Sequence, residues 1–529
     1  CGFAKTDILA PGASETVNIT VDKSELRTYD ANNAKTYIVD AGDYYFTAAT
    51  DAHNAVNNIL AAKGYTVENT DGRMTADGDV ALTYKWTNAA LDSTTYATSE
   101  TGTAITNLFD EADPNKSSSE PGEVTWLSRS NWVATFPTQP VVLNATQTLA
   151  DHLAFTRYDG SKADSVEMPT LGADNGLALV SMIGADYDDP QWDTLLDQLT
   201  FNEMVNTITL GFHNTAAIES IGKTRTKDEN GPQGLTAALT GGASAMCYTS
   251  EDVMAATFNV DLINDVGRCI GEDCLAMGYS GLYGPGINMH RTAYSGRNFE
   301  YYASDPFVAG TICAAEVNGI QSKGVYVYLK HVALNDSESS RRGVNTWLNE
   351  QAAREIYLEV ADKAVTDGGA WSVMTGFNRW GAYWCGAYDN LLTGFLRGEL
   401  GMRGMIITDY SGSSKYMDLA DGLIAGSDIW DSPDPTIHTT LAPKYENDAY
   451  IVTEMRESMH KILYTVANSN AMNGWSSADR LKVITPWWKT ALYALDTVLA
   501  VLTVLCIWRL VVAIKRKKTW TAEQAANTA

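Results

Sequence analysis

Gly401-Met-Arg-Gly-Met-Ile-Ile-Thr-Asp-Tyr-Ser411 is the stretch of sequence that decides the fold. Its centre, 405–407, is a short apolar run with two β-branched residues, and polar residues follow it. This pattern predicts a buried parallel strand with Asp409 at its carboxyl end. In a βα-barrel that end of the strands carries the reacting groups, so Asp409 followed by Tyr410 suits a nucleophile beside a stacking platform for a sugar ring. The alternative is an ordinary Asp that caps the next turn, and this stretch alone favours the alternative.

From about residue 176 onward, short apolar runs alternate with amphipathic segments. Apolar runs at 177–183, 325–329 and 371–374 precede the one at 405–407. In the intervening segment 349–367, Ile356, Val360 and Ala364 fall on one face, which is the spacing of a helix packed on a sheet. This alternation of strand and helix predicts a (β/α)8-type, TIM-like barrel, which we assign to residues 166–472.

The first 52 residues have a β pattern instead. Val17, Ile19 and Val21 alternate with polar residues, and the apolar runs at 37–39 and 44–46 flank a turn signal. Strands this few do not close a sandwich, so we predict a partial β module at residues 1–52. Residues 53–165 show little regular pattern and are predicted to be an irregular linker that wraps the barrel.

Composition limits the classes of function. The 529 residues carry a net charge of −26, which leaves no basic surface for phosphates and argues against a nucleic-acid partner. The seven Cys lack the short spacing of zinc or redox motifs, so no metal site is expected. The chain begins with Cys rather than Met, in what looks like the middle of a module, and we expect upstream sequence to be missing.

The C-terminal part is strongly apolar. Residues 487–514 are long enough to cross a bilayer, begin with Trp487-Trp488 and are followed by Lys515-Arg-Lys-Lys518. We therefore predict a single-pass transmembrane helix in the cell membrane, with the catalytic part extracytoplasmic and residues 515–529 as a cytoplasmic tail. The alternative is an amphipathic helix that lies on the barrel, but the segment has no long polar face.

Five polar motifs occur in chain order near the ends of the predicted strands. Arg, Lys, His and Asp side chains gathered at such ends can bind several sugar hydroxyls at once. The motifs are Asn230-Gly-Pro-Gln-Gly234, Gly284-Pro-Gly-Ile-Asn-Met-His-Arg291, Gly296-Arg-Asn-Phe-Glu-Tyr-Tyr-Ala-Ser-Asp-Pro306, Lys330-His-Val-Ala-Leu-Asn-Asp336 and Ile407-Thr-Asp-Tyr410.

Together these motifs resemble family 3 glycoside hydrolases, and more narrowly the β-glucosidase group. The resemblance covers about residues 165–470, and the β-patterned start resembles the second half of the fibronectin type III-like module of these enzymes. Here that module precedes the barrel, as in permuted members whose α/β sandwich domain comes first. The resemblance therefore implies an upstream α/β sandwich domain in the same polypeptide.

The resemblance also implies roles for individual residues. Asp409 aligns with the catalytic nucleophile, which forms a covalent glycosyl-enzyme in the family, and Tyr410 with the neighbouring aromatic platform. Arg297, Lys330 and His331 align with residues that hold the hydroxyls of the bound sugar. The acid/base Glu comes from the sandwich domain in the family, so it is expected upstream of this chain. The mechanism uses two carboxylates and water, and no cofactor is implied.

Two positions depart from the family pattern. Asn230 stands where the family has a hydroxyl-binding Asp, so it lacks the charge-assisted hydrogen bonds of a carboxylate. Phe377 stands where many members have Tyr, which removes a hydroxyl near the nucleophile. Two functions are therefore open: a membrane-anchored retaining β-glycosidase, β-glucosidase-like, that hydrolyses terminal sugars from oligosaccharides or glycosides, and a surface-anchored glycan-binding protein that keeps the sugar site but has lost turnover.

Overall fold

The computed structural model describes residues 2–119, 122, 124–127, 144–153, 157–412, 414–482 and 484–528. The chain forms two compact units, Cys1–Asp479 and Arg480–Ala529. The larger unit contains the sheets and the candidate site. The smaller unit consists mainly of one long helix.

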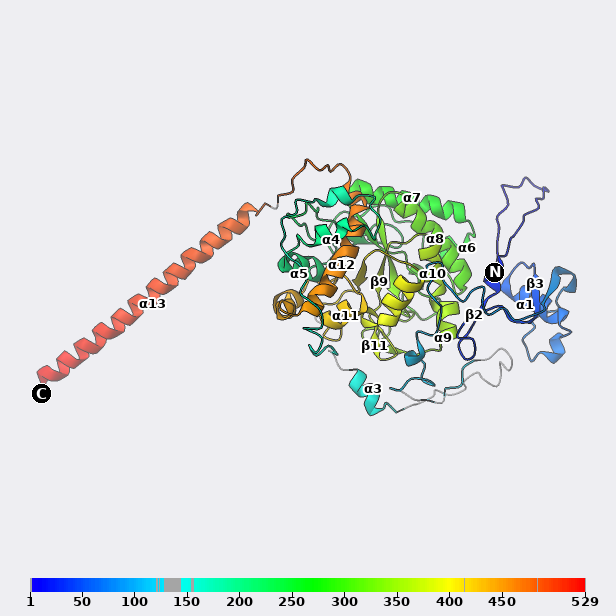
Figure 1. The fold of residues 1–529 in the computed structure, drawn as a ribbon, viewed down its shortest axis with the longest axis horizontal. Helices are drawn as coiled ribbons and strands as arrows, with labels where there is room; N and C mark the ends of the chain where they lie inside the picture. Colours follow the sequence, from blue (N-terminus) through cyan, green and yellow to red (C-terminus); the bar gives the residue numbers. More distant parts are fainter. Residues whose placement is uncertain are drawn as a thin grey trace. The chain divides into compact units, whose positions relative to one another are not determined.

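A five-stranded parallel sheet lies at the centre of the larger unit (Figure 1). Its strand order is β12-β9-β7-β6-β5, and each neighbouring pair is parallel. The register brings the carboxyl ends of the strands to one edge, where Thr408 lies opposite Thr375 and Lys330 opposite Met374. The strands are β5 (Asp228–Asn230), β6 (Gly281–Tyr283), β7 (Tyr326–Val332), β9 (Ser372–Thr375) and β12 (Ile406–Thr408).

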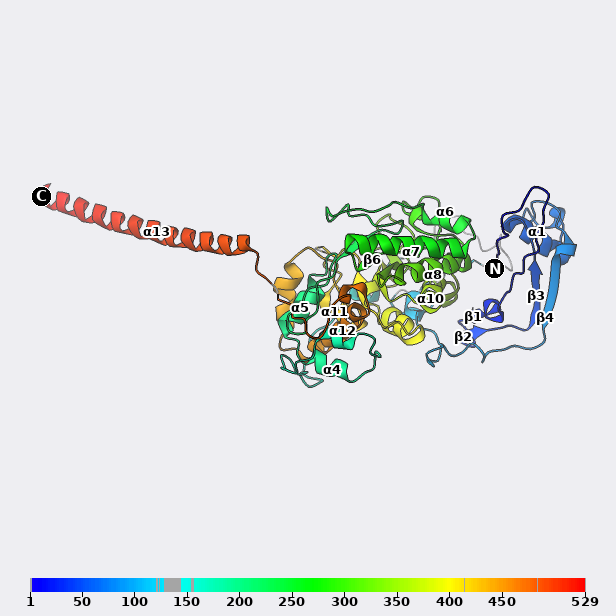
Figure 2. The same cartoon turned by 90° about the horizontal axis from the view of Figure 1, so that it is seen from above.

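The strands of this sheet are buried on both faces because helices cover it. α8 (Pro306–Gln321) packs between α7 (Val260–Met277) and α10 (Glu359–Thr366), and both views show the three side by side (Figures 1 and 2). Gly267 allows the close crossing of α7 and α8, since a Cβ there would lie 2.3 Å from the Glu316 carbonyl oxygen. Elsewhere α12 (Ala449–Ala467) packs against α4 (Gln191–Leu196), α5 (Phe201–Thr209) and α11 (Leu419–Ala425).

The predicted parallel α/β architecture is confirmed, whereas a closed eight-stranded barrel is not established. The parallel sheet of the described residues has five strands, and one isolated parallel bridge, Ile407 to Ile429, continues it beyond β12. The apolar run at 177–183, predicted as a strand, contains the 3-10 helix η5 (Leu179–Met182) instead. Leu179 and Met182 of that turn are buried in the core, which accounts for the apolar pattern without a strand.

The N-terminal segment forms two antiparallel pairs. β1 (Thr28–Asp30) pairs with β2 (Thr36–Ile38), and β3 (Gly42–Thr47) pairs with β4 (Thr83–Asn88). The predicted strand around Val17 to Val21 is wrong: the segment has no ladder partner among the described residues, and both side chains are exposed. β4 and most of α1 (Ala52–Ala62) fall within the predicted linker 53–165, of which residues 120, 121, 123, 128–143 and 154–156 lie outside the described part of the chain.

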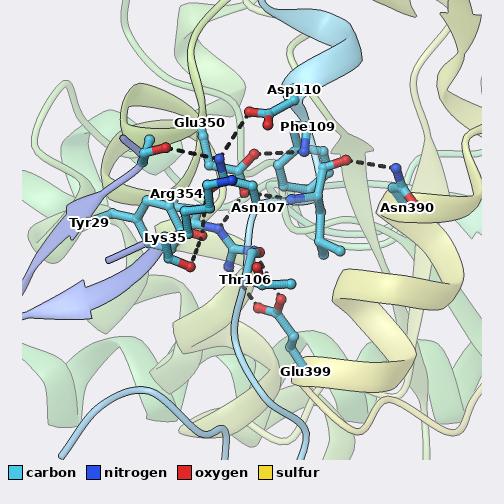
Figure 3. A network of polar contacts seen from close by, with 12 residues as sticks. Tyr29, Lys35, Thr106, Asn107, Phe109, Asp110, Glu350, Arg354, Asn390 and Glu399 are labelled. Carbon is cyan, nitrogen blue, oxygen red and sulfur yellow. Dashed lines mark hydrogen bonds and ion pairs between the residues drawn. The ribbon is translucent and has the colours of Figure 1, made fainter. Parts of the chain in front are cut away.

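A buried ion network fixes this N-terminal segment to the barrel helices (Figure 3). Arg354 donates to both oxygens of Glu399 at 2.7 and 2.9 Å and to Glu350 at 2.7 Å. Glu350 in turn accepts from the backbone N–H of Phe109 at 2.6 Å. The Arg354 guanidinium also lies 4.7 Å from the centre of the Tyr29 ring. The network therefore joins β1 and the segment before residue 110 to the helical layer.

The remaining elements are short. The helices and turns are η1 (Lys23–Leu26), η2 (Val67–Asn69), η3 (Val80–Leu82), η4 (Asp110–Ala112), α3 (Gln147–His152), α6 (Glu251–Ala256), η6 (Asn298–Glu300), α9 (Glu350–Ala352), η7 (Ala353–Tyr357), η8 (Cys385–Ala387), η9 (Asn390–Glu399), η10 (Ile437–Leu441), η11 (Ala442–Tyr445) and η12 (Asn470–Met472). A small sheet contains β8 (Asn345–Thr346), β10 (Arg379–Trp380) and β11 (Tyr383–Trp384).

The smaller unit contains α13 (Trp487–Thr528), a helix of 42 residues. It is long and apolar enough to cross a membrane, by length and composition alone. The helix continues through the basic residues after position 514 rather than ending there, so the segment predicted as a tail is helical to Thr528.

Candidate active site

Asp409 lies directly after β12, at the carboxyl end of the parallel sheet, as predicted. The residue is 8% exposed, and its Oδ1 accepts a 2.7 Å hydrogen bond from the Tyr410 backbone N–H. Its Oδ2 is buried and makes no hydrogen bond with the described residues. Burial raises the pKa of Asp409, while Arg341, the Tyr410 N–H and Arg297 act in the opposite direction. This carboxylate therefore has one fixed oxygen and one oxygen left without a donor.

His331 lies between this oxygen and the predicted sugar-binding residue Arg297. Its Nε2 lies 3.4 Å from Asp409 Oδ2 and 3.2 Å from Arg297 NH1. Burial, followed by the charges of Arg297, Lys330 and Arg341, lowers the pKa of His331 well below its usual value. The ring is therefore neutral near pH 7, and Nε2 can serve only one of its two neighbours as a hydrogen-bond partner at a time.

Arg297 and Lys330 share Glu300 as their counter-ion. Arg297 NH2 lies 2.6 Å and Lys330 Nζ 3.5 Å from Glu300 Oε2. Burial lowers the pKa of Lys330, and Glu300 partly offsets that effect. Desolvation by burial raises the pKa of Glu300, but Lys330 and Arg297 outweigh it, so the pKa of Glu300 is lowered overall. A carboxylate held ionised in this way is unsuited to deliver a proton.

The other predicted residues lie around this group. Asn230 ends β5, and its side-chain amide makes no hydrogen bond with the described residues. Phe377 is buried after β9, and Tyr410 is 36% exposed, with the centre of its ring 6.1 Å from that of Phe212. Tyr410 thus presents part of its ring to solvent beside Asp409. Contacts run from Arg297 through His331 to Asp409, and Lys330 joins them through Glu300. The roles of all seven residues stay predictions.

Two neighbours, Arg341 and Glu338, were not predicted as site residues. Arg341 NH1 lies 3.8 Å from Asp409 Oδ2, and Arg341 Nε lies 3.1 Å from Glu338 Oε2. Both residues come from the loop after β7, where Leu334 and Ser340 have positive φ values of 66° and 56°. The sequence does not show that such a loop turns back toward Asp409, which is why the contact was missed.

Asp431 is a third unpredicted neighbour. Its Oδ1 accepts 3.3 Å hydrogen bonds from the His213 N–H and from the Tyr283 hydroxyl. Its backbone is tied to β12, since the Asp431 N–H donates to Thr408 Oγ1 at 3.0 Å. Burial raises the pKa of Asp431 to about 7; the charge of His213 opposes that rise and the charge of Asp409 adds to it.

Asp228 lies deeper, inside the sheet, and does not face the predicted sugar site. Its two oxygens accept hydrogen bonds from the hydroxyls of Tyr326 at 2.6 Å and Tyr328 at 3.1 Å. Burial raises the pKa of Asp228 to about 6. These contacts occupy its carboxylate, so Asp228 does not replace the charge that Asn230 lacks.

Comparison with known proteins agrees with this geometry. Residues 212–437, which contain every predicted site residue, match the family described as "Glycosyl hydrolase family 3 N terminal domain". This region is a glycosyl hydrolase family 3 domain. Residues 1–52 match "Fibronectin type III-like domain", the predicted β module.

Individual members of family 3 are similar over parts of the chain. A "Beta-glucosidase" of Rhizobium radiobacter is 34% identical over 240 residues, which are 45% of this chain and 29% of that protein. A "Beta-glucosidase" of Ruminococcus albus is 28% identical over 78% of this chain and 39% of its own length. The chain therefore spans less than two thirds of the length of these curated relatives.

A solved structure shares the fold over most of the chain. The crystal structure of "a novel beta-glucosidase from Paenibacillus barengoltzii" matches with a TM-score of 0.64 and 20% identity. The match covers 92% of this chain and 50% of that one. At this identity the likeness supports the fold alone.

Proposed function

We propose that the protein is a retaining β-glycosidase of the β-glucosidase type, with Asp409 as its nucleophile. The observation that carries this proposal is the buried Oδ2 of Asp409, which lacks a donor among the described residues and lies 3.4 Å from His331 Nε2. A buried oxygen without a partner costs free energy, and such an oxygen in a polar site calls for a partner. Here the substrate supplies the missing partner.

In the proposed first step, Asp409 Oδ2 forms a bond to the anomeric carbon. The bond from that carbon to the leaving oxygen breaks with its electron pair, and a general acid protonates this oxygen. In the second step water attacks the same carbon and gives its proton to the general base, and the bond to Asp409 breaks. Two inversions retain the configuration at the anomeric carbon.

Arg297, Lys330 and His331 bind the hydroxyls of the terminal sugar in this proposal, with the Asn230 amide as a neutral partner. Tyr410 provides an aromatic platform, and the buried Phe377 closes the site near Asp409. The names of the relatives favour terminal sugars of the glucose type on oligosaccharides or glycosides as substrates.

The acid/base is proposed to be a Glu of an upstream α/β sandwich domain in the same polypeptide. Glu300 and Glu338 are the two glutamates of the contacts around Asp409 described above, and both are ion-paired: Glu300 with Arg297 at 2.6 Å, and Glu338 with Arg341 at 3.1 Å. An ion-paired carboxylate stays ionised and is a poor proton donor. Both proton transfers of the mechanism are therefore assigned to a residue other than these two glutamates.

We further propose that α13 anchors the enzyme in the cell membrane, with the barrel outside and the C-terminus in the cytoplasm. The support is its apolar composition and the cations Lys515 to Lys518 after the apolar part. This orientation places the proposed sugar site where extracellular glycosides are available.

The test replaces Asp409 by Asn in the full-length protein. We expect kcat for an aryl β-glucoside to fall by about a thousandfold or more, because the covalent step is lost. A 2-deoxy-2-fluoro-β-glucoside is expected to add its glycosyl mass to the peptide that contains Asp409 in the wild type alone. The control is Asp389→Asn, which alters an exposed carboxylate.

Unchanged hydrolysis in the Asp409→Asn variant would exclude Asp409 as the nucleophile. If the wild-type full-length protein binds glucosides without hydrolysing them, the glycan-binding alternative holds instead.

A further inference from the structure

Five side chains around the candidate nucleophile form a closed ring of polar contacts. Arg297 NH1 contacts His331 Nε2 at 3.2 Å, and His331 Nε2 contacts Asp409 Oδ2 at 3.4 Å. Asp409 Oδ2 faces Arg341 NH1 at 3.8 Å, and Arg341 Nε contacts Glu338 Oε2 at 3.1 Å. Glu338 Oε1 lies 3.7 Å from Arg297 NH1, which closes the ring.

One contact of this ring is incomplete on both sides. Asp409 Oδ2 and Arg341 NH1 are each buried, and neither makes a hydrogen bond with the described residues. At 3.8 Å their contact is an ion pair rather than a hydrogen bond. Contacts of this kind are often long in unliganded sites and shorten when substrate binds. The two unsatisfied atoms face each other, so each is the natural partner of the other.

Phe377 supports the guanidinium from its other side. The Arg341 guanidinium lies 4.6 Å from the centre of the Phe377 ring, and that of Arg342 lies 5.2 Å from it. A cation over an aromatic face is held by electrostatic attraction to the ring. Phe377 is buried, so its ring is fixed in place. It can therefore hold Arg341 in the direction of Asp409.

We propose that Arg341 is a positioning residue of the glycosidase site, which orients the Asp409 carboxylate and keeps it ionised. Glu338 weakens this effect of Arg341, because its carboxylate is the counter-ion of both Arg341 and Arg297. This inference rests on the proposed function of Asp409. Phe377 serves as the platform of Arg341 rather than as a contact for the sugar. The ring transmits changes at the sugar-binding Arg297 to the nucleophile through Glu338 and Arg341.

The ring of polar contacts predicts that removing Arg341 and removing Glu338 shift the pKa of Asp409 in opposite directions. Without the Arg341 charge the pKa of Asp409 rises, because burial then acts against fewer cations. Without the Glu338 charge the two guanidinium groups attract Asp409 more strongly, and its pKa falls. The other charged or titratable groups that act on Asp409 are His331, Lys330, Asp431 and Tyr416.

The experiment measures kcat/KM against pH for the full-length protein and three variants. Arg341→Gln is expected to move the acidic limb up by about one pH unit, a loss of about tenfold on that limb. Glu338→Gln is expected to move the same limb down. Arg342→Gln is the matched control, because it removes a neighbouring cation that also lies over the aromatic ring of Phe377. The acidic limb of this variant is expected to stay in place. If the acidic limb of kcat/KM lies at the same pH in the Arg341→Gln and Arg342→Gln variants, the proposal is overturned.

A second measurement does not depend on turnover. The melting temperatures of Arg341→Gln, Asp409→Asn and the double variant are compared at pH 7 and at a pH below the acidic limb. We expect the losses to be non-additive at pH 7 and additive at the low pH, where Asp409 is protonated. Additivity at both pH values would reject the coupling. Arg341→Lys replaces Arg341→Gln if the latter does not fold.

The two measurements separate the two proposals. If the wild type hydrolyses no glycoside, the proposed function fails, and the melting cycle alone decides whether Arg341 acts on Asp409.

Discussion

At the scale of single residues, Asp431 is the neighbour of Asp409 whose charge depends most on pH. Burial raises its pKa from the ordinary 3.8 to about 7. The folded state thus binds this proton more tightly than the unfolded state does. The stability that the proton provides is therefore present below about pH 4 and is lost as the pH rises toward 7. The charged form at high pH carries a penalty on the order of 4 kcal/mol at most.

Asp431→Asn removes this titration and keeps the shape of the side chain. The Asn oxygen can still accept from the His213 N–H and the Tyr283 hydroxyl. We expect the melting temperature of the variant, relative to the wild type, to rise between pH 4.5 and pH 8.5. The pKa of His213 is raised in part by Asp431, and losing that effect acts in the same direction. A difference that is constant over this range would contradict the assignment; the control is again Asp389→Asn.

The residues of the candidate site could be predicted from the sequence only where they end a strand. Lys330 and His331 lie on β7, and Asp409 follows β12, so their positions follow from the strand pattern and the register of the sheet. Arg341 approaches Asp409 Oδ2, and Asp431 acts on the Asp409 charge, from irregular segments where no period exists to indicate direction. A pattern of alternating polarity places a residue on a strand but does not show where a loop returns.

At the scale of elements, the contact of the N-terminal segment with the helical layer depends on Arg354. The guanidinium is buried between Glu350 and Glu399. Removing one partner of such a group leaves two buried carboxylates without a cation, which typically costs about 3–5 kcal/mol. We expect Arg354→Met to lower the free energy of unfolding by this amount in urea titrations.

The matched control for Arg354 removes the carboxylates as well. In Arg354→Met/Glu350→Gln/Glu399→Gln no unpaired charge remains, and much of the stability is expected to return. Hydrogen exchange should also increase in the Arg354→Met variant for residues 28–30 and 106–109, which this network holds. Equal losses in the single and triple variants would show that Arg354 acts by packing on Tyr29 rather than by charge.

Sequence patterns predicted some of these strands correctly and others not. The apolar runs of β7, β9 and β12 were correctly predicted because both faces of a parallel strand are buried. The alternation at Val17 to Val21 was misleading, since a strand also needs a partner for its hydrogen bonds and the described chain provides none there. β4 was missed because its burial alternates only weakly and its pairing with β3 is the feature that defines it.

At the scale of the whole molecule, the chain combines a very acidic large unit with a basic end to its apolar helix. The net charge is −26, yet Lys515 to Lys518 are four consecutive cations after the apolar part of α13. A polybasic segment beside a membrane span favours the cytoplasmic face. In the proposed orientation, the acidic remainder would lie on the opposite side of the bilayer.

This arrangement predicts that α13 alone keeps the protein in the membrane. Cys1–Asp479 is a compact unit of its own. A protein truncated after Asp479 is therefore expected to move from the membrane fraction to the soluble fraction and to keep its melting temperature. Leu499→Lys together with Leu502→Lys places two cations in the apolar part of the helix, each at a cost of about 2.5–3.5 kcal/mol in a bilayer, and should release the protein likewise. Lys517→Gln is the control that leaves the span intact. If the truncated protein stays with the membrane after a carbonate wash, the larger unit binds the membrane itself, and the helix is not the anchor.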